Sequence, residues 1–553
     1  MEIHLIKPAW GQAKHFRFLR STPPLGLAYV AAALIEAGHH VTVTDAVFEG
    51  YDTVIPYGPI VAQGLANADI VARIPAQAQV VGISVMATTD WPLVADLVHQ
   101  IKRARPNVFV MLGGEHPSAL PKLSLMTSGA DAVVVGEGEE TAVALMKAVA
   151  ARTALSDVRG AARLDHQGRY IPAQPRARIQ DLESLPQPAW HLFNIDGYQR
   201  RRFVGGALWQ RRRSLPMLAS RGCPYQCAFC TSPNMWTPLW VPRSPKAVVD
   251  EMIDLRDRYD VRDFSFHDLT MVVQRGWVLD LCREIVARDA GVSWQIHSGT
   301  RLEEIDDELL DHMQRAGLAS LVLAPESASE GARKRVRKQM KTADIERAIR
   351  AAVGSGIPLK VQILNGFPGD RHADAWANVR FAVRLGRMGV DGVGTAIFAP
   401  YPGTALFDEL LRKGEIEMGD DLVFFPVTNN DFSRPLLKSQ RIAPGVAKAY
   451  QLATLGGFVA SKFTFHPIAS LRSLVRAVTN DYEKRYFDKL LRALIVTVGR
   501  LFVSPCRGAP ATRPGIDYRR FPIKDLVRAR CLEPGAAAQR ECLGRAPHSP
   551  TPA

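Results

Sequence analysis

Short apolar strands alternate with amphipathic helical segments twice along this 553-residue chain, and this alternation restricts the fold more than any other feature. Over residues 1–150, runs such as "EIHLIKP", "VVGISVM" and "VFVMLGG" are separated by segments with apolar residues at helical spacing. The pattern predicts a parallel sheet with helices on both faces, that is, a doubly wound α/β domain. The chain is also longer than one ordinary domain, so two or three domains are expected.

The loops that follow these strands are rich in Gly, Ser and Thr, as in "SVMATTD", "LGGEHPSALP" and "VGEGEET". Ligands of doubly wound sheets bind beyond the carboxyl ends of the strands, and small residues let a backbone approach a polar ligand closely. Each loop taken alone also suits an ordinary turn. The candidate ligand-binding residues at this edge are Ser84, Thr88, Gly113, Gly114, Gly136 and Gly138.

The second alternation, over residues 206–430, predicts a (β/α) barrel of the TIM type, complete or partial. Its strand candidates are "SLPMLAS", "DFSFHDL", "VSWQIHS", "SLVLAPES", "PLKVQILNGFPG" and "GVGTAIFAP". Barrel enzymes keep their chemistry at the carboxyl ends of the strands. The polar residues at those ends are Asp268, His297, Glu326 and Asn365, together with the "APYPGT" loop.

The remaining segments read as a connector and a basic carboxyl-terminal region. Residues 151–205 are expected to link the two domains, 431–510 to be helical, and 511–553, rich in Pro, Gly, Ala and Arg, to be disordered. Lys and Arg exceed Asp and Glu by 14 over residues 434–553, which is the whole excess of the chain. Because the charge is confined to this region and no nucleic-acid motif appears, we expect no nucleic-acid partner.

The expected location of the protein follows from the lack of a membrane span, a signal peptide and a disulfide pattern in the sequence. No run reaches the roughly 18 consecutive apolar residues of a membrane span, and "MEIHLIKPAW" reads as a strand rather than a signal peptide. Of seven cysteines, Cys282, Cys506, Cys531 and Cys542 are scattered without the spacing of a disulfide framework. These observations predict a cytoplasmic protein.

The other three cysteines, Cys223, Cys227 and Cys230, lie within eight residues in "ASRGCPYQCAFCTSPN". Structural zinc needs four protein ligands, usually as two pairs, and no second pair follows. Disulfides would leave one thiol over. Three thiolates can instead hold three irons of a [4Fe–4S] cluster and leave the fourth iron without a protein ligand. An iron that lacks a protein ligand can bind a substrate or cofactor.

A CxxxCxxC loop after a first barrel strand resembles the radical SAM superfamily. This resemblance implies that Phe229, just before the last cysteine, packs against the adenine of S-adenosylmethionine (SAM), and that Glu326 in "LVLAPESAS" faces the SAM. "ILNGFPGD" and "IFAPYPGTAL" resemble further strands of the family. In "FSFHDLT", His267 stands where relatives more often carry an acid, so the cofactor-binding role of Asp268 is less well founded.

Residues 1–150 resemble the cobalamin-binding domain that precedes such barrels, with "PPLGLAYVAAALIEAGHHVTVTDA" matching in order with the three loops above. The D-x-H-x-x-G motif of cobalamin mutases is missing, since "DHQG" at 165–168 has the wrong spacing. The resemblance therefore implies cobalamin without a protein His on cobalt, its lower face meeting Pro8–Gln12 or a water. Some members of this architecture have lost cobalamin altogether.

Taken together, the resemblance implies an enzyme with a [4Fe–4S] cluster, SAM and cobalamin that methylates an unactivated carbon of a small or lipid-like metabolite. One alternative is an anaerobic oxidative cyclase or ring-rearranging enzyme of the same architecture. Another, from a different class, is a cobalamin-binding carrier or sensor. An electron donor such as flavodoxin or ferredoxin is implied. His267, His297 and His312 could transfer protons or be structural, and the substrate is not written in the sequence.

Residues 456–503 combine apolar faces with Arg and Lys, as in "RYFDKLLRALIVTVGRLFV". A basic amphipathic helix can lie in an anionic membrane interface, which predicts peripheral membrane contact and access for a lipid-like substrate. The alternative, in which these helices pack their apolar faces on the barrel, is the commoner arrangement for such a pattern.

Overall fold

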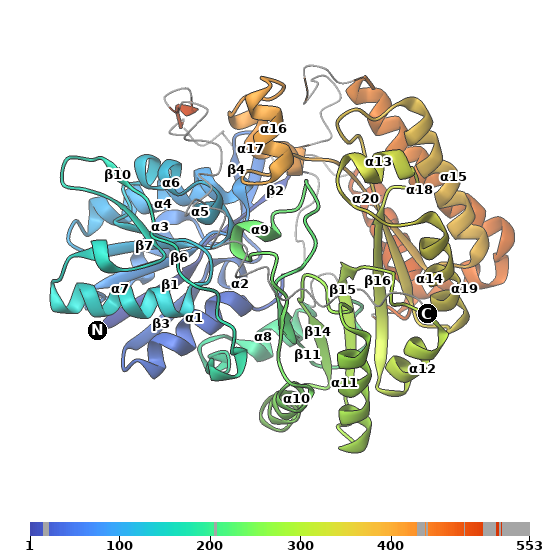
Figure 1. Ribbon diagram of the computed structural model, residues 1–553, viewed down its shortest axis with the longest axis horizontal. Coiled ribbons are helices and arrows are strands. Elements are labelled where there is room, and N and C mark those ends of the chain that lie inside the picture. Colours follow the sequence, from blue (N-terminus) through green and yellow to red (C-terminus); the bar gives the residue numbers. More distant parts are fainter. Residues whose placement is uncertain are drawn as a thin grey trace, which may run out of the picture.

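The computed structural model describes residues 1–14, 21–203, 207–428, 437, 441–480, 482–501, 516–518 and 521. Figure 1 shows one α/β domain on the left, a second on the right, and the short helix α9 (Ser232–Met235) at their boundary. Apart from 516–518 and 521, the predicted disordered tail 511–553 lies outside the described residues.

The first domain is built on a seven-stranded sheet of order β10-β9-β8-β7-β6-β1-β3. The five strands from β8 to β3 run parallel, whereas β9 and β10 add antiparallel at one edge. This arrangement confirms the predicted doubly wound domain. The strands are β1 (Glu2–Lys7), β3 (His40–Asp45), β6 (Val80–Ser84), β7 (Phe109–Gly113), β8 (Ala132–Val134), β9 (Ala161–Leu164) and β10 (Tyr170–Ile171).

Helices cover both faces of this sheet, because its parallel strands are apolar on both sides. One face carries α1 (Leu25–Glu36) and α7 (Glu139–Ala151), which contact each other. The other face carries α3 (Asn67–Arg73), α4 (Trp91–Ala104) and α6 (Pro121–Ser128). Shorter helices are α2 (Ala46–Glu49), α5 (Glu115–Ala119) and η1 (Thr88–Asp90).

The chain reverses its direction of strand addition between β1 and β6, which pair side by side. Ligands of doubly wound sheets bind at such a switch point, beyond the carboxyl ends of the strands. A small antiparallel sheet lies next to it, formed by β2 (Trp10–Ala13), β5 (Ile60–Gln63) and β4 (Val54–Tyr57). The predicted cobalamin edge is therefore the edge at which the sheet can hold a ligand.

The segment 151–205 does more than connect the domains, because β9 and β10 continue the first sheet past residue 150. Farther along, the backbone N–H of Ala189 donates to the Ala28 carbonyl at 3.0 Å, and Trp190 is fully buried. The segment also contains η2 (Leu155–Asp157), η3 (Leu182–Ser184), η4 (Trp190–Leu192) and α8 (Ile195–Arg200). It thus runs along the first domain before it reaches the second.

The second domain has six parallel strands in the order β11-β14-β15-β16-β17-β18. β11 and β18 are not paired with each other, so the barrel is partial. The strands are β11 (Ser214–Met217), β14 (Asp263–Phe266), β15 (Ser293–Thr300), β16 (Leu318–Glu326), β17 (Leu359–Asn365) and β18 (Gly392–Ile397). A two-stranded ribbon, β12 (Ser220–Arg221) and β13 (Val241–Pro242), follows β11.

The helices of the second domain pack on the outside of the barrel, where alternate strand residues such as Trp294 and Ile296 are buried against them. Several begin at a side-chain cap; for example, Ser244 accepts a hydrogen bond from the Ala247 N–H at 3.2 Å. These helices are α10 (Pro245–Tyr259), α11 (Arg275–Ala287), α12 (Asp307–Arg315), α13 (Glu330–Arg335), α14 (Thr342–Gly354) and α15 (His372–Met388).

Two helices follow β18 within residues 206–430, namely α16 (Ala405–Arg412) and α17 (Asp420–Thr428). The carboxyl-terminal region beyond residue 430 is helical in its described part, as the pattern predicts, with α18 (Pro444–Phe465), α19 (Pro467–Thr479) and α20 (Tyr486–Leu501). Helix α18 packs along α15, and α20 places Tyr486 against Leu208 and Val322 at the open side of the barrel. Within the described residues, no helix is both long and apolar enough to cross a membrane.

Candidate active site

The three cysteines lie on the loop between β12 and α9, at the carboxyl end of the barrel. Gly222, which begins the loop, has φ +89°, and a Cβ there would overlap the Leu239 carbonyl oxygen. Two long-range backbone bonds hold the loop, since Ala228 N–H donates to Val336 O at 2.9 Å and Ala228 O accepts from Leu406 N–H at 2.8 Å. The loop is therefore shaped by the barrel around it.

The thiols of Cys223, Cys227 and Cys230 are half-buried and unbonded to one another. Burial raises the pKa of each, that of Cys230 to about 12, and the neighbouring thiols add to the effect. The positive side chains of Lys338 and Arg301 act in the opposite direction. Buried thiols ringed by cations suit ligands whose negative charge is shared with a metal cluster.

No described group of three or more His, Cys, Asp or Glu side chains converges on one point as the ligands of a single metal ion do. In an iron–sulfur cluster each cysteine binds a different iron. The assignment of Cys223, Cys227 and Cys230 as iron ligands stays a prediction.

Phe229 is half-buried within the cysteine loop and begins a row of three aromatic rings. Its ring centroid lies 5.3 Å from that of Phe367, which lies 5.4 Å from that of Phe398. Phe367 and Phe398 follow β17 and β18, so the row joins the loop to the far strands of the barrel. An apolar surface of this kind suits the flat face of an adenine.

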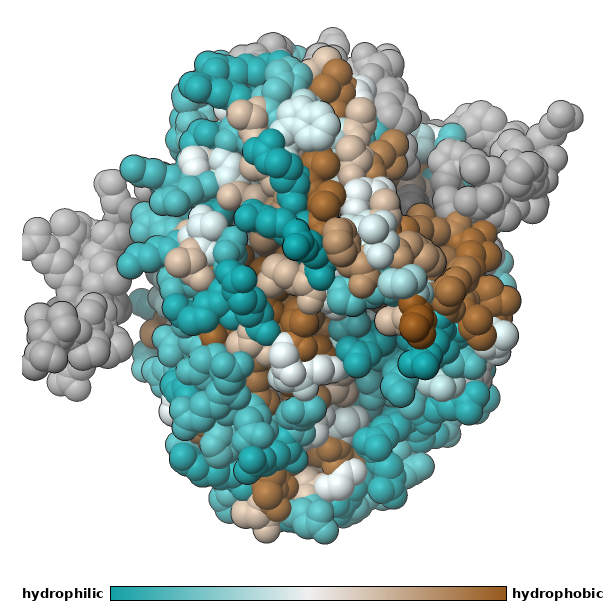
Figure 2. Space-filling view, turned by 90° about the vertical axis from the view of Figure 1, so that its right-hand side faces the viewer, coloured by the Kyte–Doolittle hydropathy of each residue, from teal (hydrophilic) through white to brown (hydrophobic). Residues whose placement is uncertain are grey.

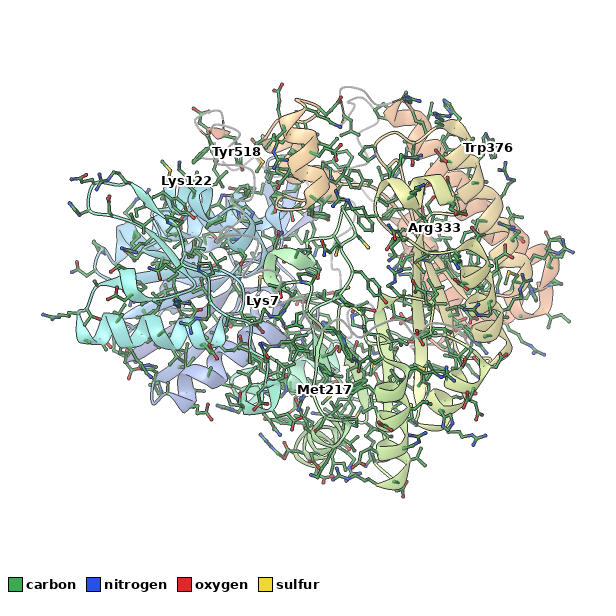
Figure 3. All side chains as sticks on the ribbon, viewed as in Figure 1. Lys7, Lys122, Met217, Arg333, Trp376 and Tyr518 are labelled. Atoms are coloured by element: carbon green, nitrogen blue, oxygen red, sulfur yellow. The ribbon has the colours of Figure 1, made fainter. Side chains whose placement is uncertain are left out.

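Glu326 is the last residue of β16 and has a left-handed backbone, with φ +65°. Its Oε1 lies 3.3 Å from the Lys338 Nζ, and burial raises the pKa of the carboxyl group. The buried Arg333 orders the intervening segment, because its guanidinium donates to the Ser327 and Met340 carbonyls and to Thr342 Oγ1. Arg333 is labelled in Figure 3 at the top of the barrel.

Asp268 lies behind the cysteine loop, where its carboxylate accepts hydrogen bonds from protein groups. The Ala219 N–H donates to Oδ2 at 3.1 Å, and the Ser220 hydroxyl donates to Oδ1. Ser220 Oγ in turn accepts from the Trp240 indole at 2.9 Å. In this arrangement Asp268 orients the segment that enters the loop, so its role as a direct cofactor ligand stays a prediction with little geometric support.

Arg301 closes the other side of the cysteine loop. Its guanidinium stacks on the Tyr225 ring at 3.7 Å from the centroid, pairs with Glu303, and donates to the Gln339 carbonyl at 2.8 Å. Because Tyr225 lies between Cys223 and Cys227, this stack restrains the middle of the loop.

The first domain presents its candidate residues along one edge. Ser84 and Gly113 end neighbouring strands at the same level, and Gly114 follows with φ +110° and a virtual Cβ 2.5 Å from the Val85 oxygen. Gly136 has φ +81°, and Gly138 caps α7. These glycines let the backbone turn tightly at this edge, because a Cβ at Gly114 would meet the Val85 backbone and one at Gly138 would lie 3.0 Å from Val30 Cγ2.

Thr88 is buried at the same edge, where its hydroxyl lies 3.1 Å from His116 Nδ1. His116 Nε2 and the Gln12 Oε1 are buried without a hydrogen-bond partner, and unpaired buried polar atoms are costly. The glycine-rich backbone of this edge, together with these unpaired polar atoms, fits a large ligand that carries amide groups around its rim, such as cobalamin. The absence of a protein His on cobalt is untested by this geometry and stays a prediction.

Ion pairs join the glycine-rich edge to the cysteine loop. Arg221, two residues before Cys223, pairs with Glu137 at 3.1 Å and with Glu139 at 2.6 Å, and all three side chains are buried. Arg178 adds a second bond to Glu137 at 2.7 Å. In "VGEGEET", Glu137 and Glu139 therefore bind Arg221 of the second domain, and the two glycines remain at the edge.

Helix α9, directly after the last cysteine, also contacts the first domain. The Asn234 side-chain amide donates to Glu115 Oε1 at 2.7 Å and to the Pro402 carbonyl at 3.0 Å. Ser118 Oγ lies 3.3 Å from the Met235 sulfur. In Figure 3, Lys7 marks the end of β1 on one side of this boundary, and Met217 the end of β11 on the other.

A pocket with about 210 Å³ of empty volume opens between the domains. Its walls come from Thr88 of the first domain, from the loop after β18, and from α17. The lining residues are Thr88, Pro400, Tyr401, Pro402, Met418, Leu422, Val423 and Pro426. Thr88 of the first domain thus lies beside the loop that follows β18.

Several of these contacts were not predicted from the sequence. The partners of Lys338, Arg221 and Arg301 lie far away in the chain. In the sequence, the only feature that marks these three residues is a positive charge close to an apolar strand. His267 and His297 come together inside the barrel, whereas His312 lies outside it on α12.

Two family models match the chain. The B12 binding domain matches residues 17–146, and the Radical SAM superfamily matches residues 217–382. These ranges are the two α/β domains described above, and the second contains the three cysteines and Glu326.

Two similar curated proteins are enzymes. The cytidylyl-2-hydroxyethylphosphonate methyltransferase of Streptomyces wedmorensis is 28% identical over 73% of this chain and 80% of its own. The anaerobic magnesium-protoporphyrin IX monomethyl ester cyclase of Synechocystis is 30% identical over 59% of this chain and 61% of its own.

A solved structure has the same fold. The radical S-adenosylmethionine methyltransferase TsrM of Kitasatospora setae, with cobalamin and a [4Fe-4S] cluster bound, superposes with a TM-score of 0.59. It is 18% identical, over 74% of this chain and 75% of its own.

Proposed function

The chain belongs to the radical SAM enzymes that carry a B12-binding domain, and we propose that it methylates an unactivated carbon of a small or lipid-like metabolite. When bound, a [4Fe–4S] cluster, SAM and cobalamin supply hydrogen abstraction and a methyl donor. The protein binds these groups, orients them and excludes water.

In this proposal Cys223, Cys227 and Cys230 each hold one iron and leave the fourth for SAM. Phe229 lies against the adenine. Lys338 is close enough to Glu326 and to the cysteines to pair with the SAM carboxylate, while Glu326 accepts from a polar SAM group. Asp268 orients the loop through Ala219 and Ser220 instead of touching a cofactor.

The observation that carries the proposal is the buried ion pairing of Arg221 with Glu137 and Glu139. It fixes the glycine-rich edge of the B12-binding domain directly against the cysteine loop. A methyl donor held at that edge would face the mouth of the barrel, as methylation of a substrate in the barrel requires. Two domains that acted independently would not need this contact.

An oxidative cyclase is the second candidate, because one relative carries that name. Incubating reconstituted protein with SAM, dithionite and a candidate substrate distinguishes the two. A methylase forms S-adenosylhomocysteine and 5′-deoxyadenosine, whereas a cyclase forms only 5′-deoxyadenosine. A protein that forms neither would be the carrier or sensor, and the proposal would fall. A small electron donor of the flavodoxin or ferredoxin type is proposed as the physiological reductant.

The C-terminal helices carry an exposed apolar stripe, which we propose contacts an anionic membrane surface. Ile468, Leu471, Val475 and Val478 follow helical spacing on α19 and are 55–68% exposed. Figure 2 shows apolar side chains gathered on the right of the face that it presents. Exposed stripes of this size are uncommon on proteins that act alone in water.

Cations surround the stripe and complement an anionic surface. Arg472 and Lys484 are exposed, and Arg387 stacks over Phe465 at 5.3 Å. Each basic residue near such a surface contributes about 1 kcal/mol. The alternative stated from the sequence, complete packing on the barrel, accounts only for the inner faces of these helices, which bury Ser470, Ser473 and Ala477.

Co-sedimentation with phosphatidylglycerol vesicles tests the membrane proposal. We expect Val475→Ser to weaken binding several-fold, while Val286→Ser, an equally exposed valine on α11, changes nothing. Full-length protein that stays in the supernatant at low salt would refute the proposal. If the protein instead self-associates and Val475→Ser abolishes this self-association, the stripe binds a second copy of the chain.

A further inference from the structure

One layer of the barrel interior is polar and basic. Phe266 pairs with Ile296 in the strand register, so the next residues, His267 and His297, lie at one level. On the other strands, Lys360 pairs with Val322 on one side and with Gly392 on the other. Residues at one level of a barrel that share a strand face point to the same interior. His267, His297 and Lys360 therefore face one another across the lumen, below the level of Glu326.

Lys360 brings a positive charge into this layer. It is half-buried, and no hydrogen bond or ion pair joins its Nζ to any other residue that the structure describes. Burial and, to a lesser extent, the nearby Lys489 lower its pKa to about 8. Lys489 itself lies 3.8 Å from Glu483 and donates to the Ala207 carbonyl, so its charge is compensated and that of Lys360 is not.

The two imidazoles add neutral donors to the layer. Their ring centroids lie 4.5 Å apart, and His297 Nδ1 lies 2.7 Å from Ser265 Oγ. Burial lowers the pKa of His267 to about 4 and that of His297 well below its usual value. His267 Nε2 is buried without a hydrogen-bond partner, so a polar group still has a place beside it.

The acids around this layer are already occupied. Asp263, two inward-facing positions below His267 on β14, accepts from Ser293 Oγ and Gln295 Nε2, both at 2.9 Å. Glu483 accepts from the Trp209 N–H at 3.1 Å and faces Lys489. Among the residues that the structure describes, no carboxylate forms an ion pair with Lys360.

The wall above Lys360 is lined by small side chains. Gly394 pairs with Gln362 in the register, and a Cβ at Gly394 would overlap the Gln362 amide. Ala396, the next residue on this face of β18, is exposed although it lies inside the barrel. The Gln362 amide therefore lies against Gly394 in the layer next to Lys360, where it offers one polar group.

We infer that Lys360, with His267, His297 and Gln362, binds an anionic end of the substrate, a phosphate, phosphonate or carboxylate group. The inference rests on the proposed function, because it places the reacting carbon above this group, toward the cysteine loop. An anion here would neutralise Lys360 and accept a hydrogen bond from His267 Nε2, which is otherwise buried without a partner.

Small anions test the site in the full-length, cluster-reconstituted protein. Dissociation constants of methylphosphonate and of acetate are measured by ligand-observed nuclear magnetic resonance in buffer without chloride, phosphate or sulfate. At least one of the two should bind, and the one that binds more tightly identifies the class of anion. Acetamide, a neutral match for acetate, should bind at least tenfold more weakly.

Lys360→Met should weaken anion binding at least tenfold, whereas Lys360→Arg should retain it, because the charge is what binds. Lys246→Met, on the exposed face of α10, is the matched control and should leave binding unchanged. Equal affinity in Lys360→Met and wild type would overturn the inference, as would failure of both anions to bind the wild type.

The same variants separate this inference from the proposed function. Substrate-free formation of 5′-deoxyadenosine from SAM and dithionite is measured in the wild type and in the Lys246→Met control, where it should be equal. SAM cleavage in the wild type, with unchanged anion affinity in Lys360→Met, would overturn the anion site alone. Absent SAM cleavage in the wild type would refute the proposed function and leave the anion affinities as an independent result.

Discussion

Arg221 shows how a single residue can serve both domains. Its guanidinium reaches Glu137 and Glu139 and lies over the Tyr29 ring at 4.9 Å, with every charge buried. A buried pair contributes little net stability by itself, but removal of one partner leaves the other charges unpaired in a medium of low polarity. The residue is therefore far more costly to remove than an exposed arginine.

We expect Arg221→Met to lower the free energy of unfolding by about 3–5 kcal/mol, since two buried carboxylates lose their cation. Urea denaturation followed by circular dichroism measures the change. Arg258→Met, which removes an exposed ion pair with Asp254 on α10, should cost less than about 1 kcal/mol. Similar losses in the two variants would contradict the coupling described here.

His116 gives a second residue-scale prediction, in the dependence of stability on pH. Burial lowers its pKa to about 3, from about 6.5 in the unfolded chain, so the folded state binds fewer protons between these values. Its contribution to stability is complete above about pH 6.5 and is lost as the pH falls toward 3. His116→Gln should therefore flatten the decline in this window.

The slope of unfolding free energy against pH, from urea titrations between pH 7 and 4, is the measurement for His116. The comparison uses slopes, because the substitution also alters the stacking of His116 on Trp91, which affects all pH values alike. Parallel slopes in variant and wild type would show that the buried imidazole does not titrate as argued.

At the scale of elements, the strands were predictable because each is a short apolar run bounded by turn residues. Four of the six barrel strands lie within the runs named from the sequence, whereas β15 continues two residues past its run and β16 begins two residues before its run. The cysteine spacing located the loop after the first strand. β9 and β10 were not predicted, because "AARL" and "YI" carry too little apolar signal and pair only through the edge of a sheet formed earlier.

The site was less predictable than the strands, for a physical reason. The cysteines act through local spacing, whereas Lys338, Lys360 and Asp268 act through partners on other strands. Asp268 is at a strand end, as expected, but its carboxylate turns toward Ala219 and Ser220. Strand position can be read from a sequence pattern, but the direction of a side chain depends on long-range neighbours.

Helix α20 completes the barrel where the sheet is open, and this contact yields an element-scale prediction. A Cβ added at Gly392 would lie 2.7 Å from the Tyr486 Cβ, and the Tyr486 hydroxyl lies 3.1 Å from Ser320 Oγ. Gly392→Ala should push α20 outward and lower the free energy of unfolding by about 1–3 kcal/mol.

Gly456→Ala is the matched control, because this glycine lies inside α18 with no atom within 4 Å of its virtual Cβ. Alanine there should raise the stability of the helix by up to about 1 kcal/mol. If α20 is packed as described, Gly392→Ala should lower the unfolding temperature and Gly456→Ala should raise it. Equal effects would mean that Tyr486 does not fill the space at Gly392.

At the scale of the whole molecule, the buried pairs and α9 join the two domains at the cysteine loop. A ligand that binds one domain should then stabilise both. We expect hydroxocobalamin to raise the unfolding temperature of the wild type as a single transition, because the linkage acts on the cooperative unit. Differential scanning calorimetry with and without the ligand measures this shift.

In Arg221→Met the transition should separate into two, and hydroxocobalamin should move only one of them. Two transitions already present in the wild type, with one responding to the ligand, would show that the domains unfold independently. That result would also remove the structural support for a methyl donor held against the barrel.

The amino-terminal end of the barrel is closed by Gln295, which accepts from the Leu208 N–H at 2.8 Å and donates to its carbonyl at 2.9 Å. Ser320 and Tyr486 complete this floor, and all of these side chains are buried. A substrate that reacts above this closed base would enter and leave through the carboxyl end of the barrel. We therefore expect a product that still lies in the barrel to delay the binding of the next substrate molecule.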